Sequence, residues 1–489
     1  MNYLFYIILS ISAAGIIFVP LWFKYKLKKD FFIKQSISKI LAKNPEFFST
    51  KIVSDSVLIG LKHHKTPILE QLIKGNINKV AQSESKYNKI SPYLLKSFEK
   101  PQVGINFLEK HLKKNPADND AFVWLALLLE KSNKPKAAAA WDNVNENKLS
   151  KYLKAHYLTH MSDIAAQNGD LEFASDLQYK AARLFAREQA FYEEGQVYLK
   201  LGTLYRICFI DDTAEALLRS AIKLFKQIKY ERGVAQGHAN LGMLMISQER
   251  FEEAHSLLQK AYEYYQKQED LSSQAEIENQ LALLYLVQKQ TKAALKFLKQ
   301  AEKNHLQSQN RQGLAFSQEL MANTYWQEGQ YTQTAKFAQK AAQIYKQEEN
   351  VSGRLESLYL QAQALVKQEE NEKAEDILRS IIEQGKKNSG CFYLANAYTL
   401  LGIIYMRRKD LLRAKGLFRQ SLELEQRGTR TKALAADYAN IGLVELCCGH
   451  KETAQKNIET ALDLACQIED EELCLNLRQH LAKINNSSQ

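Results

Sequence analysis

The sequence predicts an all-α protein built from stacked pairs of antiparallel helices, and three sets of small residues indicate this fold. Each set recurs at a step of forty residues, and the second and third sets follow the first by twelve and nineteen residues. Small residues are needed where two helix backbones approach closely. The first set is Ser162, Gly202, Gly242, Ala282, Ala322, Ala362, Gly402 and Gly442. The second is Ala174, Ala214, Ala254, Ala294, Thr334, Ala374, Ala414 and Ala454, and the third is Ala181, Ala221, Ala261, Ala301, Ala341, Ile381, Ser421 and Ala461.

The stretches LGTLY at 201–205, LALLY at 281–285 and LGIIY at 401–405, with the alanines that follow them, resemble the tetratricopeptide repeat (TPR). The resemblance covers about two thirds of the chain strictly, as eight forty-residue repeats over 151–470. It implies a right-handed α-solenoid of helical hairpins. Repeats of this longer type resemble those of kinesin light chains, cortical-polarity adaptors and some bacterial peptide-sensing regulators, all of which are binding scaffolds.

The distribution of proline is consistent with longer helices in these repeats. All seven prolines lie before residue 136, whereas proline commonly stops the second helix of a standard unit of thirty-four residues. Six extra residues per repeat add roughly 9 Å of helix at 1.5 Å per residue. We therefore expect the repeats after residue 150 to have unusually long helices.

The amino-terminal segment predicts a single transmembrane helix over 3–23. No charged side chain occurs from Met1 to Phe23, and twenty-one residues of helix span about 31 Å, which matches a hydrocarbon core of ~30 Å. A cleaved signal peptide is the alternative, because Ser12, Ala13 and Ala14 offer a cleavage site. The missing basic residue before the apolar run favours the retained anchor.

Charge predicts how the anchor is oriented. Four lysines follow the apolar run directly, and by the positive-inside rule they place the repeats in the cytoplasm. Residues 1–150 carry a net charge of +11, which is the whole excess of the chain, and the remaining residues have 43 basic and 43 acidic side chains. Anionic headgroups explain this basic segment better than nucleic acid, although the lysines could also serve only as topology signals. The four are Lys24, Lys26, Lys28 and Lys29.

The segments on either side of the strict repeats also read as helical. Residues 24–85 form a basic juxtamembrane segment of irregular helices, and 86–150 contain two looser TPR-like repeats. Residues 471–489 are expected to form an amphipathic capping helix and a polar tail, which would shield the apolar end of the stack.

Metal, cofactor and catalytic chemistry have no clear signature in the sequence. The six cysteines form no Cys-x-x-Cys pair, and His156 and His160 have no third ligand at a defined spacing. Phosphate-loop, dinucleotide-binding and Gly-x-Ser-x-Gly motifs are missing. We therefore predict a protein that is not an enzyme and needs no cofactor, and an enzymatic role would have to reside in the irregular segment 30–120.

The candidate binding surface follows from the family resemblance, because in this family the first helix of each hairpin lines the concave groove. Amide side chains could hold the backbone of an extended peptide, and aromatic groups could form pockets. The rival interpretation is that several of the apolar residues, Leu283, Met406 and Phe316 especially, pack against a neighbouring repeat. The predicted groove residues are Gln236, Asn240, Met243, Glu276, Asn279, Gln280, Leu283, Phe316, Asn323, Trp326, Tyr359, Gln363, Met406 and Arg407.

Together these features predict a membrane-anchored scaffold or adaptor that binds proteins or peptides on the cytoplasmic side. A peptide-responsive sensor or regulator is the second hypothesis. Bacterial regulators of lipopolysaccharide synthesis are similar in layout, but their module with two Cys-x-x-Cys pairs is missing here. The bacterial inner membrane is favoured as the location, and the mitochondrial outer membrane is the alternative, since its import receptors have a comparable plan.

Overall fold

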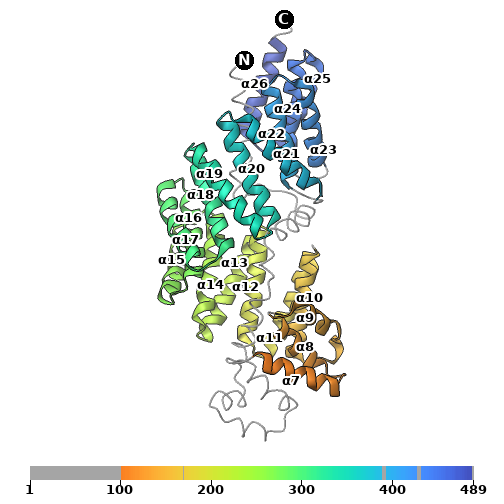
Figure 1. Cartoon of the computed structure of the whole chain (residues 1–489), viewed down its shortest axis with the longest axis vertical. Helices are drawn as coiled ribbons and strands as arrows, with labels where there is room; N and C mark the ends of the chain where they lie inside the picture. The colour runs from red at the N-terminus through yellow and green to blue at the C-terminus, as the bar shows by residue number, and fades with distance from the viewer. Residues whose placement is uncertain (1–100, 131, 169, 388–391, 427–430, 487–489) are drawn as a thin grey trace. The chain divides into compact units, whose positions relative to one another are not determined.

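A computed structural model describes residues 101–486 apart from 131, 169, 388–391 and 427–430, and all regular structure in these residues is helical. The described residues form two units, 101–264 and 265–486, whose boundary falls within α15. Figure 1 shows helices that run back and forth, each antiparallel to the next. The predicted all-helical fold is confirmed for these residues.

The first unit begins with three shorter helices and a 3-10 turn, and longer helices follow. In every pair from α10 onward, we call the even-numbered helix the first helix and the odd-numbered one the second helix. The elements are α7 (Pro101–Lys114), α8 (Asn119–Leu129), α9 (Lys134–Asp142), η4 (Glu146–Lys148), α10 (Lys151–Gln167), α11 (Leu171–Arg187), α12 (Phe191–Ile207), α13 (Asp211–Gln227), α14 (Glu231–Ser247) and α15 (Phe251–Lys267).

The second unit continues the same pattern up to a terminal helix. Most of its helices have seventeen residues, which corresponds to about 25 Å of helix. They are α16 (Leu271–Val287), α17 (Thr291–Gln307), α18 (Arg311–Gln327), α19 (Tyr331–Gln347), α20 (Val351–Lys367), α21 (Asn371–Lys387), α22 (Phe392–Arg407), α23 (Leu411–Gln426), α24 (Thr431–Cys447), α25 (Lys451–Gln467) and α26 (Glu471–Asn486).

The small residues lie where the two helices of a hairpin meet. A Cβ atom added at Gly202 would lie 3.2 Å from the backbone oxygen of Ala214, and one added at Gly442 would lie 3.1 Å from that of Ala454. In the first hairpin the Ser162 hydroxyl donates a 2.7 Å hydrogen bond to the Ala174 carbonyl. The first and second sets of small residues therefore face each other across the hairpin.

The turns between helices repeat one backbone conformation. A residue with positive φ recurs every twenty positions, for example Lys289 with φ 60° and Gly329 with φ 71°. In the turn after α16, the Gln290 N–H donates to the Tyr285 carbonyl over 2.8 Å and so satisfies a carbonyl at the helix end. Several turns end in a capping residue; the Asn310 side chain, for instance, accepts from the Gly313 N–H at the start of α18.

The membrane-related predictions fall on residues that the structure does not describe. The predicted anchor 3–23, the lysines Lys24, Lys26, Lys28 and Lys29, and the juxtamembrane segment 24–85 all lie outside the described residues. Within residues 101–486, as far as they are described, no helix is both long enough and apolar enough to cross a membrane.

Candidate functional site

The first helices of successive hairpins contact one another directly within each unit. Helix α12 contacts α14 in the first unit, and in the second unit α16 contacts α18, α18 contacts α20 and α20 contacts α22. No pair of consecutive second helices among the described residues is in comparably close contact. The first helices therefore line the more tightly wound side of each unit, which is the side where a groove is expected in this fold.

Hydrogen bonds identify the side chains on that side. The Lys200 ammonium on α12 donates to both carboxylate oxygens of Asp163 on α10, over 3.1 and 3.2 Å. The Thr203 hydroxyl on α12 donates to the Asn240 side-chain oxygen on α14 over 3.1 Å. We define the inner face as the positions equivalent to Gln236, Asn240 and Met243 at forty-residue steps; they are spaced i, i+4 and i+7 and share one side of a helix.

Nine of the predicted groove residues belong to this inner face. Phe316 is 42% exposed, whereas Gln363 is only 4% exposed; Glu276 is exposed and the other six are partly exposed. The nine are Gln236, Asn240, Met243, Glu276, Gln280, Leu283, Phe316, Asn323 and Gln363.

Two other predicted groove residues, Asn279 and Tyr359, stand one position before an inner-face position and are buried between hairpins. The Asn279 amide lies 3.3 Å from the His305 ring, and its oxygen accepts a 2.8 Å hydrogen bond from the Ser317 hydroxyl. Tyr359 packs against Tyr393, with 5.9 Å between the ring centroids. Both side chains connect consecutive repeats.

The remaining three predicted groove residues lie near the carboxyl ends of their helices. Trp326 and Met406 are buried in hydrophobic clusters, and the Trp326 ring meets Tyr331 edge-on at 5.3 Å. The Arg407 guanidinium donates to the Val366 carbonyl over 3.2 Å. Core packing therefore describes Met406, as the rival interpretation expects, whereas Phe316 is exposed.

A second polar cluster in the first unit consists of Glu130, Trp141 and His160, which precede Asp163 and Lys200 in the sequence. The Glu130 carboxylate accepts a 3.2 Å hydrogen bond from the Trp141 indole and lies 3.9 Å from the His160 ring, which stacks on Trp141. Burial raises the pKa of Glu130 to about 7 and lowers that of His160 to about 4. His160 is therefore uncharged near neutral pH and Glu130 is only partly ionised, whereas Asp163 and Lys200 form an ion pair on this part of the inner face.

Sequence reasoning missed Glu130, Asp163 and Thr203. Asp163 and Thr203 could have been found, because they precede Met243 by eighty and forty residues in the same register. Glu130 lies in the irregular repeats, where no fixed step indicates which residues face the helices that follow.

In the second unit, the inner face contains three buried amide oxygens that accept no hydrogen bond from the described protein. They are Oε1 of Gln280 on α16, Oε1 of Gln363 on α20 and Oδ1 of Asn440 on α24. Asn440 is 2% exposed. A buried acceptor without a donor costs about 1–3 kcal/mol, so each of these amide oxygens favours an additional hydrogen-bond donor.

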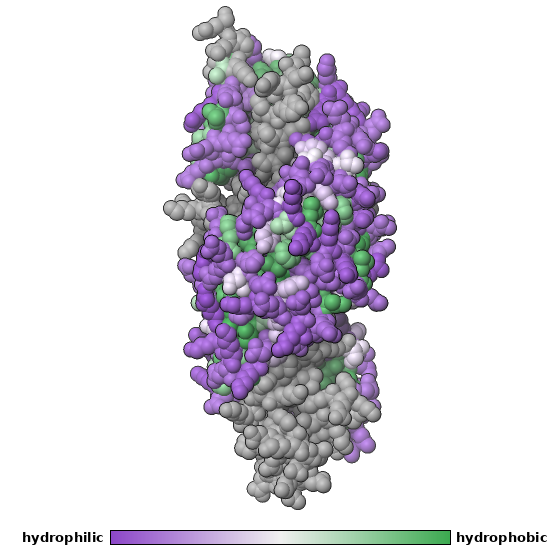
Figure 2. Space-filling model, turned by 90° about the vertical axis from the view of Figure 1, so that its left-hand side faces the viewer, coloured by the Kyte–Doolittle hydropathy of each residue, from purple (hydrophilic) through white to green (hydrophobic). Residues whose placement is uncertain are grey.

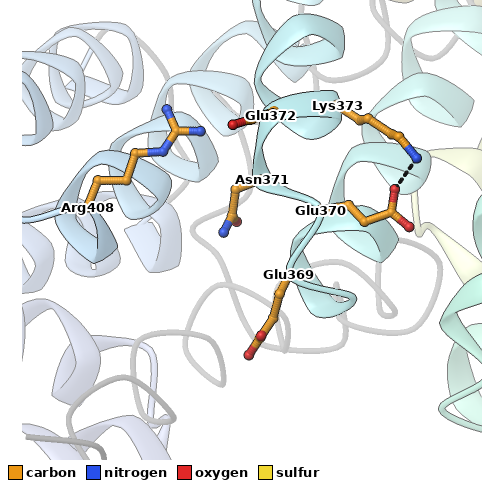
Figure 3. Close-up of a pocket in the computed structure, with 6 residues that line it drawn as sticks. All are labelled: Glu369, Glu370, Asn371, Glu372, Lys373 and Arg408. Atoms are coloured by element: carbon orange, nitrogen blue, oxygen red, sulfur yellow. Dashed lines mark ion pairs between the residues drawn. The ribbon is translucent and has the colours of Figure 1, made fainter.

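A separate pocket of about 360 Å³ lies at the ends of helices in the second unit (Figure 3). Glu369, Glu370, Asn371, Glu372 and Lys373 come from the turn before α21 and from its start, and Arg408 follows α22. Lys373 pairs with Glu370, and Arg408 pairs with Glu375 outside the pocket. Lys373–Glu370 is thus the ion pair within the lining, and the pocket is not on the inner face.

One face of the molecule is drawn by hydropathy in Figure 2. On the face drawn in Figure 2, hydrophilic residues dominate and hydrophobic residues form small separate patches. No group of three or more His, Cys, Asp or Glu side chains in the described residues could hold a metal ion. The inner-face positions carry amide, carboxylate, histidine and single apolar side chains besides the Asp163–Lys200 ion pair.

The described helices define a TPR-like solenoid, and comparison with solved structures agrees. The apo form of the quorum sensor NprR from B. thuringiensis matches with a TM-score of 0.50 and 17% identity, covering 72% of this chain and 99% of that one. A STAND signal transduction ATPase with a tetratricopeptide repeat sensor from Pyrococcus horikoshii matches with a TM-score of 0.54 and 14% identity, covering 96% and 69%. No protein-family model and no curated protein matches the sequence. At these identities the likeness shows the fold alone.

Proposed function

We propose that this protein is a membrane-anchored scaffold that binds protein or peptide partners through the inner faces of its first helices. The apolar run 3–23 and the lysines that follow it supply the anchor and keep the repeats on the cytoplasmic side. Such an arrangement concentrates a partner near the bilayer.

The observation that carries this proposal is the set of unmatched amide oxygens at Gln280, Gln363 and Asn440. A polypeptide segment carries one N–H donor on nearly every residue, and such donors would satisfy the acceptors on α16, α20 and α24, which are alternate first helices. Phe316, exposed on α18, adds an apolar contact for a partner side chain. Amides for the partner backbone and an aromatic group for a side chain are typical of peptide recognition.

Site-directed photocrosslinking tests the proposal. A photoreactive amino acid at Asn323, which is partly exposed on the inner face of α18, is expected to capture a defined partner in cells. The matched control is Gln339, which is exposed on the adjacent second helix α19 and is expected to capture none. Adding Gln280→Leu, which removes one amide while keeping similar volume, should reduce capture at Asn323 severalfold. Identical products from Asn323 and Gln339 would contradict binding at the inner face.

A peptide-responsive sensor is the second candidate function. The two similar structures are those of a quorum sensor and of a signal transduction ATPase with a TPR sensor, and an inner face with unmatched acceptors suits a short peptide equally well. Small-angle scattering separates the two roles. A sensor should become more compact when cell-extract peptides are added, whereas a scaffold should keep its radius of gyration.

A further inference from the structure

Two cysteines of the terminal hairpin lie side by side. Cys466 is in the last turn of α25 and Cys474 is in the first turn of α26, and their Sγ atoms are 3.2 Å apart. A disulfide bond needs about 2.05 Å between the sulfur atoms, so an approach of roughly 1 Å would join them. Cys466 is exposed to solvent and Cys474 is buried.

The turn between the two helices fixes this arrangement. Glu469 adopts a positive φ of 54°, and the Asp470 N–H donates to the Ala465 carbonyl over 3.1 Å. The Asp470 carboxylate then accepts a 3.1 Å hydrogen bond from the Leu473 N–H and so caps α26. The same turn occurs throughout the described repeats, but only here does it place two thiols opposite each other among the described residues.

We propose that Cys466 and Cys474 form a reversible disulfide that fastens α26 to α25. The oxidant is a low-molecular-weight disulfide such as glutathione disulfide. In the first step the Cys466 thiolate attacks one sulfur of the oxidant, forming a mixed disulfide and releasing one glutathione thiolate. In the second step the Cys474 thiolate attacks Sγ of Cys466 and releases the second glutathione. Two protein thiols are oxidised and one disulfide is reduced to two thiols, so atoms and electrons balance.

The environments of the two thiols suit these separate roles. Exposure makes Cys466 the thiol that a dissolved disulfide reaches first. Burial raises the pKa of Cys474 to about 11. Cys466 and Asp470 also raise this pKa, whereas the charge of Arg478 lowers it. The second step therefore becomes faster as pH rises toward that pKa, because more of Cys474 is then the thiolate.

The bond would control the end of the helical stack. Helix α26 covers the last hydrophobic cluster with Leu473, Leu477 and Ile484, which pack with residues such as Ile458 and Ala461 of α25. Terminal elements open more readily than internal ones. A covalent link at the first turn of α26 keeps the helix in place, and reduction lets it open again.

Peptide mapping of the purified full-length protein tests the proposal directly. No Lys or Arg lies between Lys456 and Arg478, so trypsin leaves both thiols in the single peptide 457–478, while Cys447 and Cys448 fall in the peptide 433–451. After incubation with glutathione disulfide at pH 8, peptide 457–478 should lose two hydrogen atoms and regain them on reduction. Further cleavage after Glu469, Glu471 and Glu472 should give fragments that only the disulfide joins.

Two variants sharpen the outcome. Cys474→Ser should instead keep one glutathione on Cys466, whereas Cys447→Ser/Cys448→Ser should behave as the natural protein does. Amide hydrogen exchange in α26 should slow about tenfold on oxidation of the natural protein and should not change in Cys474→Ser. A stable glutathione adduct on the natural Cys466, a link to peptide 433–451, or unchanged exchange in α26 would each overturn the proposal.

Discussion

At the scale of single residues, the first set of small residues determines the distance between the two helices of a hairpin. A Cβ atom at Gly402 would lie 2.7 to 3.0 Å from ring atoms of Phe418, which is fully buried. We expect Gly402→Ala to lower the free energy of unfolding by about 1–3 kcal/mol, since the ring has no space to move into. Urea unfolding followed by circular dichroism measures this change.

Gly416, in the second helix of the same hairpin, is the matched control. No atom lies within 4 Å of a Cβ built there, and the residue is exposed. Gly416→Ala should therefore stabilise the protein by about 0.5–1 kcal/mol, because alanine favours the helix. Equal effects of the two substitutions would contradict the packing role of the ladder.

Buried Glu130 gives stability a defined pH dependence. Its pKa rises from 4.5 to about 7 on folding because of burial, so the folded state resists ionisation. The resulting loss of stability is absent well below pH 4.5, grows between pH 4.5 and pH 7 because the unfolded state ionises while the folded state stays protonated, and is complete above pH 7, at about 3 kcal/mol. Glu130→Gln should remove it. The unfolding free energy of this variant relative to the natural protein should increase by that amount between pH 4.5 and pH 8.

The exposed Glu252→Gln on α15 serves as the control for this titration. The difference in unfolding free energy between this variant and the natural protein should stay within about 0.5 kcal/mol between pH 4.5 and pH 8. Buried His156, whose pKa burial lowers to about 3, destabilises the protein in the opposite direction as pH falls below 6.5. That effect is common to all three proteins and cancels in the comparison.

At the scale of the element, the helix-ending turns use an unfavourable residue at most positions. Lys289 has a φ of 60°, a conformation that glycine adopts without cost. Lys289→Gly is therefore expected to stabilise the protein by about 0.5–1 kcal/mol. Thermal unfolding at fixed pH measures it.

The control makes the same chemical change inside a helix. Lys299 is exposed in the middle of α17, and Lys299→Gly should destabilise by up to about 1 kcal/mol. If Lys289→Gly stabilises the protein and Lys299→Gly destabilises it, then backbone conformation, rather than the lost charge, determines the stability of the turn. Destabilisation by Lys289→Gly would show that the lysine side chain stabilises the turn.

Helices and their pairing could be predicted from the sequence because the same pattern of small residues recurs in every repeat. Gly242 and Ala254 are unremarkable alone, but their recurrence at a step of forty identifies a helix contact. The inner face was only partly predicted. Asn279 and Gln280 are adjacent in sequence, yet one connects two repeats and the other faces the inner side, because successive residues differ by about 100° around a helix.

Other features depend on tertiary contacts that no sequence motif indicates. Cys466 and Cys474 are eight residues apart, a spacing without meaning until the turn at Glu469 reverses the chain. Glu130 meets His160 only after three helices have packed. Such groups become apparent from coordinates and not from spacing.

At the scale of the whole molecule, the proposed anchor leads to a cell-fractionation prediction. Deleting residues 1–29 removes the apolar run and the four lysines, and should move the protein from the membrane fraction to the supernatant. The control replaces only Lys24, Lys26, Lys28 and Lys29 with glutamine, and should keep the protein in the membrane, with altered orientation in a topology reporter fused after Gln489. Membrane association of the deletion variant would contradict the anchor.

The turns that recur every twenty residues also bear on how such a chain can change its length. Two turns complete one repeat, so removing or duplicating forty residues restores every helix to an equivalent neighbour. A change of twenty residues would place a first helix where a second helix belongs and expose its inner face on the wrong side. Lineages of this protein are therefore expected to differ in length by whole pairs of helices, with the unmatched amides gained or lost one repeat at a time.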